Sequence, residues 1–357
     1  MALDTVKFIK KLVDEGYSHL CVVPCSFAKN VINESINNNK IQYVPCASEA
    51  VACSIAAGLK MVGKKPIIIV QSSGMTNMGS CITSLLKPYN ITLPILTSWR
   101  TYNKDDSEIQ HQHLATKLPK LLEAYGYSHT ILNQNSLKSS IDQINTCDSS
   151  FTIGIIKKDT FTKIELNDEH KLNLSGYIQR SEFLLELNEK FKGTGTIFIG
   201  TTGNTSREMY SYMPDTNNFY MAGNMGGALS LGLGIAMGGK KVIVCGGDAE
   251  FVMHMGGLTT SGRYKDIDLT YILFDNEQNK STGGQNTFQN HLDYISIAEA
   301  SGFEIEKKTI TDLANFTSII EKLKVKNGIK FILVKCGLDD ISPRPPIDVV
   351  KVNKINY

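Results

Sequence analysis

The sequence lacks the features that place a protein in a membrane or on nucleic acid. Its 357 residues contain no run of about 20 apolar residues, the length that a membrane-spanning helix requires. Lysine and arginine number 37 against 35 aspartates and glutamates, and the formal net charge is only +2. We therefore expect neither a basic nucleic-acid surface nor an amphipathic membrane helix. Residues 1–20 lack the apolar core of a signal peptide, which favours a cytoplasmic location.

Cysteine patterns of structural or metal-binding type are also missing. The chain has eight cysteines, but no two of them form a CxxC pair and none belongs to a Cys/His cluster with zinc spacing. Several lie in apolar runs, as Cys245 does in VIVCGG. We expect free, buried thiols in a reducing compartment, and no disulfide framework.

Strand-like apolar runs alternate with helical stretches along the whole chain, which predicts an α/β fold with mainly parallel sheets flanked by helices. The length and the 42% hydrophobic content are sufficient for two such domains, each with its own core. We predict a first domain over residues 1–165, a linker over 166–177 and a second domain over 178–357.

The predicted elements follow from the same patterns. In the first half, we expect strands at 19–23, 41–44, 66–71, 92–97 and 151–156, and helices at 4–15, 27–37, 49–62, 79–88 and 115–125. In the second half, we expect helices at 178–191, 225–238 and 251–262, and strands at 196–199, 241–246, 269–274 and 330–335.

Polar residues follow two of the predicted strands in the second half. Asp248 comes after the run VIVCGG, and Asn276 comes after the next strand, 28 residues further on. Taken singly, the two residues are also typical of a helix cap and a turn. Together, at the shared edge of a parallel sheet, a carboxylate and an amide suit Mg²⁺, and helix N-termini at that edge favour an anion.

Two further segments carry candidate site residues. Glu49 lies at the N-terminus of a helix rich in small residues, where an acid is also expected for purely electrostatic reasons. Gly223 and Met225 precede a Gly-rich helix, in which a lone Met is usually a packing residue. The glycines of that helix do not lie on a strand-to-helix turn, and this argues against a dinucleotide site.

These segments together resemble those of the thiamine diphosphate-dependent enzymes, whose diphosphate motif is GDG followed later by Asn. Here the motif reads Gly247-Asp248-Ala249 with Asn276, and Ala249 stands where the family usually has glycine. The resemblance implies that Asp248, Asn276 and the main-chain carbonyl of Gln278 bind Mg²⁺. It also implies that Gly247, Asp248 and Ala249 contact the diphosphate.

The same resemblance assigns roles around the aminopyrimidine ring of the cofactor. Glu49 matches the glutamate that bonds ring nitrogen N1′ and promotes ylide formation. Met225 matches the bulky apolar residue beneath the cofactor, and the carbonyl of Gly223 would hold the 4′-amino group. The predicted domains then correspond to a pyrimidine-binding domain at 1–165 and a diphosphate-binding domain at 178–357, with no room for a central third domain.

Five segments, in order along nearly the whole chain, resemble the phosphonopyruvate decarboxylases in particular, with the sulfopyruvate decarboxylases next. They are VPCSF at 23–27, the stretch 71–100, TTGNTSREMY at 201–210, STGGQNT at 281–287 and PRPP at 343–346. The resemblance implies decarboxylation of 3-phosphonopyruvate to phosphonoacetaldehyde and CO₂ through a thiamine diphosphate ylide, in phosphonate biosynthesis. It also implies a homo-oligomer with active sites between chains.

A phosphonate requires cations and several N–H donors. We predict substrate contacts from Ser26, Ser73, Arg100 and Lys280, of which Arg100 is favoured because it directly follows a predicted buried strand and Trp99. Each basic residue taken alone is more typical of a solvated surface.

His111, in EIQHQH where the family has a Gln-His pair, is predicted to be catalytic together with Glu49. His254 is an alternative proton carrier, and Arg207 is a further candidate contact for the anion. Lys280 departs from the family, which more often has an acid at that position.

Three alternatives stay open at this point. Sulfopyruvate differs from phosphonopyruvate mainly in charge, so the same chemistry on sulfopyruvate is the first. A catalytically silent subunit with the same fold, serving in assembly, is the second, and the presence of Glu49, Asp248 and Asn276 argues against it. A nicotinamide dehydrogenase is the third, and the absence of a strand–GxGxxG–helix unit argues against it.

Overall fold

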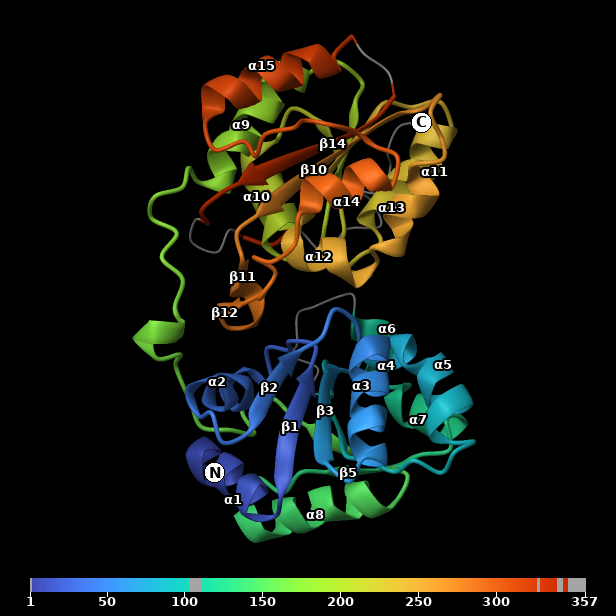
Figure 1. Cartoon of the computed structure of the whole chain (residues 1–357), viewed down its shortest axis with the longest axis vertical. Helices are drawn as coiled ribbons and strands as arrows, with labels where there is room; N and C mark the ends of the chain where they lie inside the picture. The colour runs from blue at the N-terminus through green and yellow to red at the C-terminus, as the bar shows by residue number, and fades with distance from the viewer. Residues whose placement is uncertain (1, 103–110, 326–327, 339–342, 346–357) are drawn as a thin grey trace. The chain divides into compact units, whose positions relative to one another are not determined.

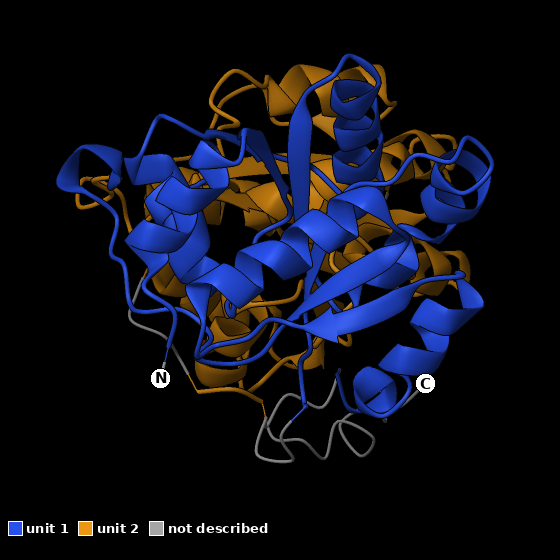
Figure 2. Cartoon of the chain, turned by 90° about the horizontal axis from the view of Figure 1, so that it is seen from below, with its two compact units in different colours: residues 1–171, 279–286 blue, residues 172–278, 287–357 orange. Residues whose placement is uncertain are grey.

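The computed structural model describes residues 2–102, 111–325, 328–338 and 343–345, which form two compact units (Figures 1 and 2). The first unit contains residues 1–171 and 279–286, and the second contains residues 172–278 and 287–357. Pro346, the last residue of the PRPP segment, lies outside the described ranges.

The first unit is built on a six-stranded parallel sheet with the strand order β2-β1-β3-β4-β6-β5. The strands are β1 (Tyr17–Val22), β2 (Gln42–Pro45), β3 (Lys65–Gln71), β4 (Ile95–Ser98), β5 (Ser128–Ile131) and β6 (Thr152–Ile156). The central strand β3 is apolar and buried over Pro66–Val70, as expected of a strand with both faces covered.

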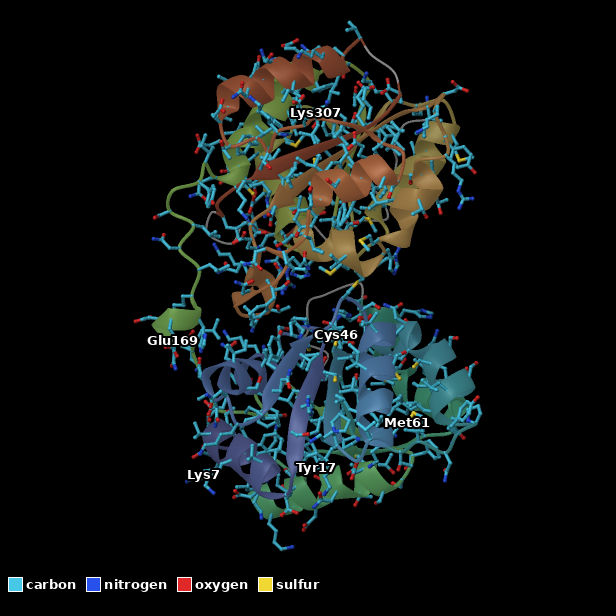
Figure 3. All side chains as sticks on the ribbon, viewed as in Figure 1. Lys7, Tyr17, Cys46, Met61, Glu169 and Lys307 are labelled. Atoms are coloured by element: carbon cyan, nitrogen blue, oxygen red, sulfur yellow. The ribbon has the colours of Figure 1, made fainter. Side chains whose placement is uncertain are left out.

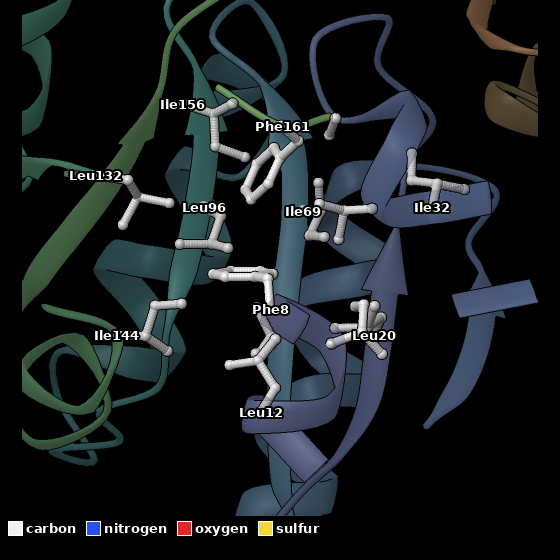
Figure 4. Close-up of a cluster of buried hydrophobic side chains, with 14 of the residues drawn as sticks. Phe8, Leu12, Leu20, Ile32, Ile69, Leu96, Leu132, Ile144, Ile156 and Phe161 are labelled. Atoms are coloured by element: carbon white, nitrogen blue, oxygen red, sulfur yellow. The ribbon is translucent and has the colours of Figure 1, made fainter. Parts of the chain in front are cut away.

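Helices cover both faces of this sheet. They are α1 (Thr5–Asp14), α2 (Lys29–Asn37), α3 (Glu49–Met61), α4 (Gly74–Asn77), α5 (Gly79–Cys81), a π-helical turn (Ile82–Leu86), α6 (Gln112–Ala115), α7 (Leu118–Ala124) and α8 (Leu137–Ser149). One core cluster joins Phe8 of α1, Ile32 of α2 and Ile144 of α8 to Ile69 and Leu96 of the sheet (Figure 4). Side-chain N-caps fix where the helices begin, as Asp4 does for α1, Ser48 for α3 and Ser136 for α8.

The second unit has its own six-stranded parallel sheet, in the order β13-β14-β10-β9-β7-β8. Its strands are β7 (Ile197–Gly200), β8 (Asn217–Tyr220), β9 (Val242–Gly247), β10 (Asp268–Asp275), β13 (Glu304–Ile305) and β14 (Gly328–Lys335). Two short strands, β11 (Gln278–Asn279) and β12 (Gln285–Asn286), pair separately.

Two hydrophobic clusters cover the two faces of the second sheet. Its helices are α9 (Arg180–Phe191), α10 (Asn204–Tyr212), α11 (Ala228–Met237), α12 (Asp248–Met253), α13 (Gly256–Ser261), α14 (Tyr294–Ala300) and α15 (Leu313–Leu323). One cluster contains side chains of α9, α10 and α15, and the other contains side chains of α11, α12, α13 and α14. Among the described residues, no helix is both long and apolar enough to span a bilayer.

The predicted fold class is confirmed, and most predicted strands are present with small shifts of their ends. The prediction missed β5, β8, β13 and the helices α8, α10, α14 and α15. The predicted helix 251–262 is wrong as one element, because α12 ends at Met253 and α13 begins at Gly256. The predicted helix 79–88 is likewise a short α-helical turn followed by a π-helical turn.

Candidate functional site

Asp248 and Asn276 lie at the carboxyl ends of neighbouring strands in the second unit. Asp248 is the first residue of α12, directly after β9, and Asn276 directly follows β10. The two strands pair in parallel up to Phe274 and Gly247, so both polar side chains start from the same edge of the sheet. Both residues are 4% exposed.

A hydrogen-bond network joins this edge through Thr287. The Thr287 hydroxyl donates to Asp248 Oδ2 at 3.1 Å, and its N–H donates to the Glu277 carbonyl at 2.9 Å. Asn276 Nδ2 donates to the main-chain carbonyl of Gln278 at 3.0 Å. The carboxylate, the amide and the carbonyl predicted as ligands therefore belong to one local cluster. Thr287 was not predicted as a site residue, although it ends the STGGQNT segment.

The charge at this edge favours a bound cation. Burial and the neighbouring Asp275 carboxylate raise the pKa of Asp248 to about 7. Lys335 lies beside Asp275, at 3.0 Å, and also pairs with Glu277. The described residues contain no group of three His, Cys, Asp or Glu arranged for a metal. A carboxylate with amide and carbonyl oxygens nevertheless fits Mg²⁺, which prefers such hard ligands.

The loop before α11 has an unusual backbone. Asn224 has φ of 57° and Gly226 has φ of 91°. A Cβ on Gly226 would lie 2.7 Å from Cγ of His254. Glycine is therefore needed there both for the positive φ and for the lack of space. Met225 lies between these two positions and Gly223 directly precedes them, and both are half-buried. The loop thus presents Met225 from a fixed backbone, and His254 packs against the loop.

Thr201, at the end of β7, and Asn204, at the start of α10, add polar groups to the same unit. The Thr201 side chain is 3% exposed, and it would be the nearest neighbour, at 3.9 Å, of a Cβ on Gly247. Within the described part of the chain, Thr201 Oγ1 and Asn204 Oδ1 are buried without a hydrogen-bond partner. Unsatisfied buried polar atoms on Thr201, near Gly247, and on Asn204 fit a polar ligand such as a diphosphate. The sequence analysis named neither residue, and Arg207, which it did name, is half-buried on α10.

In the first unit, Glu49 is the first residue of α3 and is 5% exposed. Asn77, from α4, donates through Nδ2 to Glu49 Oε2 at 2.9 Å. A Cβ on Gly74 would lie 2.3 Å from Glu49 Oε1, so only glycine allows α4 to approach the carboxylate this closely. The Glu49 side chain is therefore fixed between two helices, and Asn77 is a contact that sequence reasoning missed.

Arg100, two residues after β4, is 6% exposed. Its Nη1 donates to the hydroxyl of Ser26, and its guanidinium lies over the Phe27 ring at 4.4 Å. The next residue, Thr101, has φ of 58°, which is rare for a β-branched residue and typical of functional sites. The Thr101 hydroxyl donates to the carbonyls of Arg100, at 2.6 Å, and of His111, at 3.2 Å.

The structure thus brings Ser26, Arg100 and the buried His111 into one region of the first unit. Ser73 follows the neighbouring strand β3, and its hydroxyl accepts a hydrogen bond of 2.7 Å from Gln71 Nε2.

Lys280 belongs to the first unit although it follows Asn276 by only four residues. The segment 279–286 is fastened to α2 by Gln285, whose Nε2 donates to Asn33 Oδ1 at 2.8 Å. Both side chains of this contact are fully buried. The half-buried Lys280 therefore lies in the same unit as Arg100 and Ser26. Nothing in the sequence pattern indicated the contact between Asn33 and Gln285.

Two family descriptions match the chain. Residues 6–121 match "Thiamine pyrophosphate enzyme, N-terminal TPP binding domain", and residues 199–334 match "Thiamine pyrophosphate enzyme, C-terminal TPP binding domain". Glu49 and Arg100 lie in the first range, and Asp248 and Asn276 lie in the second.

Three relatives are similar to much of the chain or to a part of it. A phosphonopyruvate decarboxylase of Streptomyces viridochromogenes is 27% identical over 316 residues, covering 81% of this chain and 77% of that protein. A sulfopyruvate decarboxylase of Methanosarcina acetivorans is 25% identical over 353 residues, covering 92% of this chain and 90% of that protein. A sulfopyruvate decarboxylase subunit beta of Methanothermobacter thermautotrophicus is 37% identical over 156 residues, covering 43% of this chain and 80% of the subunit.

Proposed function

Because this chain belongs to the thiamine pyrophosphate enzymes and is a decarboxylase of the phosphonopyruvate and sulfopyruvate type, we propose that its substrate is 3-phosphonopyruvate. The products are phosphonoacetaldehyde and CO₂, in phosphonate biosynthesis. The observation that carries the choice is the buried Arg100 guanidinium, held by Ser26 and stacked on Phe27.

Charge explains why a buried arginine suits this substrate. Phosphonopyruvate carries a carboxylate and a phosphonate of nearly two charges. Cations must bind the phosphonate and not the carboxylate, because tight binding of the group that leaves as CO₂ stabilises the ground state and slows the reaction. Arg100 and Lys280, with the hydroxyls of Ser26 and Ser73, bind the phosphonate. The planar guanidinium allows a bidentate contact, which an ammonium group does not.

Each domain has its own proposed role toward the cofactor. Residues 1–165 bind the aminopyrimidine and residues 178–357 bind the diphosphate. Asp248, Asn276 and the carbonyl of Gln278 hold Mg²⁺, and Gly247, Ala249 and Thr201 line the diphosphate site. Gly223 and Met225, in the loop before α11, would contact the aminopyrimidine.

Thiamine diphosphate, when bound, supplies the electron sink for loss of CO₂. Glu49 holds a proton that its carboxylate shares with the aminopyrimidine ring nitrogen N1′. Asn77 keeps this carboxylate in place. His111 delivers the proton to the product carbon after CO₂ has left. Burial of Glu49, Arg100 and His111 keeps water from these groups.

A comparison of three acids tests the proposal. We expect kcat/KM of the wild-type protein for phosphonopyruvate to exceed the value for sulfopyruvate. It should exceed the value for pyruvate, which lacks the second anion, by about tenfold or more, since a charged contact contributes about 1.5–3 kcal/mol. Sulfopyruvate is the second candidate, because the Methanosarcina acetivorans relative covers 92% of the chain. If kcat/KM is higher for sulfopyruvate than for phosphonopyruvate, then sulfopyruvate is the substrate and the proposal is wrong.

Arg100→Ala should lower kcat/KM for phosphonopyruvate by about ten- to a hundredfold and leave the value for pyruvate nearly unchanged, because only the phosphonate contact is lost. Lys280→Ala should act in the same direction with a smaller effect. The control is Arg263→Ala, which removes an exposed guanidinium of the second unit and should change kcat/KM by less than about twofold. Equal losses for phosphonopyruvate and pyruvate would show that Arg100 does not bind the phosphonate.

We also propose that the protein is a homo-oligomer with active sites shared between chains. Helix α3 and the residue after it expose Val51, Ile55, Met61 and Val62, of which Met61 (Figure 3) is 73% exposed. Helix α11 exposes Leu231 and Met237, by 36% and 56%. Helix α3 begins at Glu49 and α11 begins three residues after Met225, so apolar surfaces of this kind near proposed cofactor residues suit contact with a second copy.

Mixing two inactive variants tests this assembly. Chains with Glu49→Gln and chains with Asp248→Ala, refolded together, should recover up to about a quarter of wild-type activity, because a mixed dimer has one intact site. Each variant refolded alone should stay inactive. A fully active monomer in sedimentation would contradict the shared site.

A further inference from the structure

Glu250 is a buried acid that the proposed reaction does not use. It lies two residues after Asp248 on α12 and is 3% exposed. Its carboxylate accepts a hydrogen bond from the hydroxyl of Tyr271, and the backbone N–H groups of Ala228 and Gly247 lie near it and lower its pKa against the rise that burial causes. These donors belong to β10, to the start of α11 and to the end of β9.

Glu250 thus faces the two segments of the second unit that hold the cofactor in the proposed site. Ala228 is the first residue of α11 and directly follows the loop that contains Met225. Gly247 is the residue before Asp248. The first N–H groups of a helix lack partners within the helix, and an acid near them is favourable. The Glu250 carboxylate lies near such a group and near the turn that carries the metal ligand.

The surroundings of Glu250 keep this arrangement rigid. The Tyr271 ring is 1% exposed and stacks on Phe251, with 6.2 Å between ring centroids and 12° between ring planes. Packing therefore fixes the Tyr271 ring, and its hydroxyl is held against the Glu250 carboxylate. His254, at the end of the same short helix, packs on Gly226 of the Met225 loop. Helix α12 thus contacts the loop at its C-terminal end.

We propose that Glu250 is a positioning residue for thiamine diphosphate, which holds the Met225 loop and the Gly247–Asp248 turn in one fixed arrangement. The inference rests on the proposed placement of the cofactor on these two segments. Without the carboxylate, the Tyr271 hydroxyl loses its acceptor, and the Ala228 and Gly247 N–H groups lose the negative charge that both face. Cofactor binding must then order the two segments, and this lowers the affinity.

Glu250→Gln tests the role directly. The amide keeps the shape of the side chain but presents N–H donors to groups that are themselves donors. The dissociation constant for thiamine diphosphate, measured by calorimetry in saturating Mg²⁺, should rise by about ten- to a hundredfold. At saturating cofactor, kcat should stay within about threefold of wild type, because Glu250 does not touch the reacting atoms.

Tyr271→Phe and Tyr294→Phe form a matched pair. Both delete one buried hydroxyl beside Phe251, and the Tyr294 ring lies edge-on to Phe251 at 5.1 Å. The Tyr294 hydroxyl donates to Gln289 at 2.8 Å and not to Glu250. Both variants should lower the melting temperature. Only Tyr271→Phe should weaken cofactor binding, by about three- to tenfold, since the hydrogen bond that orients the Glu250 carboxylate is lost.

Two results would overturn the proposal. One is a dissociation constant for folded Glu250→Gln within about threefold of wild type. The other is a Tyr294→Phe variant that binds the cofactor as weakly as Tyr271→Phe. If Glu250→Gln does not fold, the tyrosine pair decides alone. Calorimetry uses no substrate, so a failure of phosphonopyruvate to react would count against the proposed function and not against this role of Glu250.

Discussion

Glu49→Gln should lower kcat by about two to four powers of ten, the range expected when a group that transfers a proton is lost. Glutamine preserves the shape of the side chain, and its Oε1 still accepts the bond that Asn77 donates to Glu49. The close contact with Gly74 is also preserved. Cofactor affinity should therefore stay within about threefold of wild type, because the substitution removes the ability to hold a proton and little else.

The measurement combines steady-state kinetics with calorimetry of thiamine diphosphate binding. Glu34→Gln is a matched control, because Glu34 is a carboxylate of the same unit that is 8% exposed and lies on α2, outside the proposed site. This control should keep kcat within about threefold of wild type. A Glu49→Gln enzyme with undiminished turnover would refute the proton-transfer role of Glu49.

Asp248→Asn should act in opposite directions on the free protein and on the loaded protein. Burial and the Asp275 carboxylate disfavour a charged Asp248, so a neutral amide should leave the melting temperature of the cofactor-free protein unchanged or higher. The side-chain amide of the variant can keep both hydrogen bonds of Asp248: its oxygen accepts from the Ala249 N–H, and its NH₂ group donates to the Thr287 hydroxyl. Binding of thiamine diphosphate with Mg²⁺ should weaken by roughly a hundredfold or more, because the charged ligand is lost.

Melting curves with and without thiamine diphosphate and Mg²⁺ measure both effects. The control is Asp268→Asn, at the opposite end of β10, where Asp268 pairs with Lys241 at 3.0 Å. That variant should lose some stability but retain the full rise in melting temperature on adding the cofactor and the metal. If the melting temperature of Asp248→Asn rises as much as that of the wild type on adding the cofactor and the metal, Asp248 is not a metal ligand.

The sequence predicts those parts of the fold and site that depend on local pattern. Continuous apolar runs such as Pro66–Val70 identify buried strands, and polar residues after such runs fall at one edge of a parallel sheet. This reasoning placed Asp248 and Asn276 at neighbouring strand ends, as the structure has them. It failed for β5, whose four residues SHTI are mostly polar, and for α8, whose sequence LKSSIDQINTCDS contains few apolar residues.

Contacts between distant residues could not be predicted in this way. Asn77 touches Glu49 only because α4 packs on α3, and Thr287 reaches Asp248 from 39 residues further along the chain. The placement of Lys280 in the first unit depends on Gln285 and Asn33, which are 252 residues apart. No pattern in a single sequence specifies such pairs, because each depends on how separate elements pack.

Reconstitution with phosphonopyruvate tests the central claim most directly. Protein freed of metal and cofactor is given phosphonopyruvate with thiamine diphosphate alone, with Mg²⁺ alone, and with both, while CO₂ and aldehyde are measured. We predict equal amounts of CO₂ and phosphonoacetaldehyde only when both are added. The account would be contradicted if no CO₂ formed in the presence of both thiamine diphosphate and Mg²⁺. It would also be contradicted if CO₂ formed at the same rate without either of them.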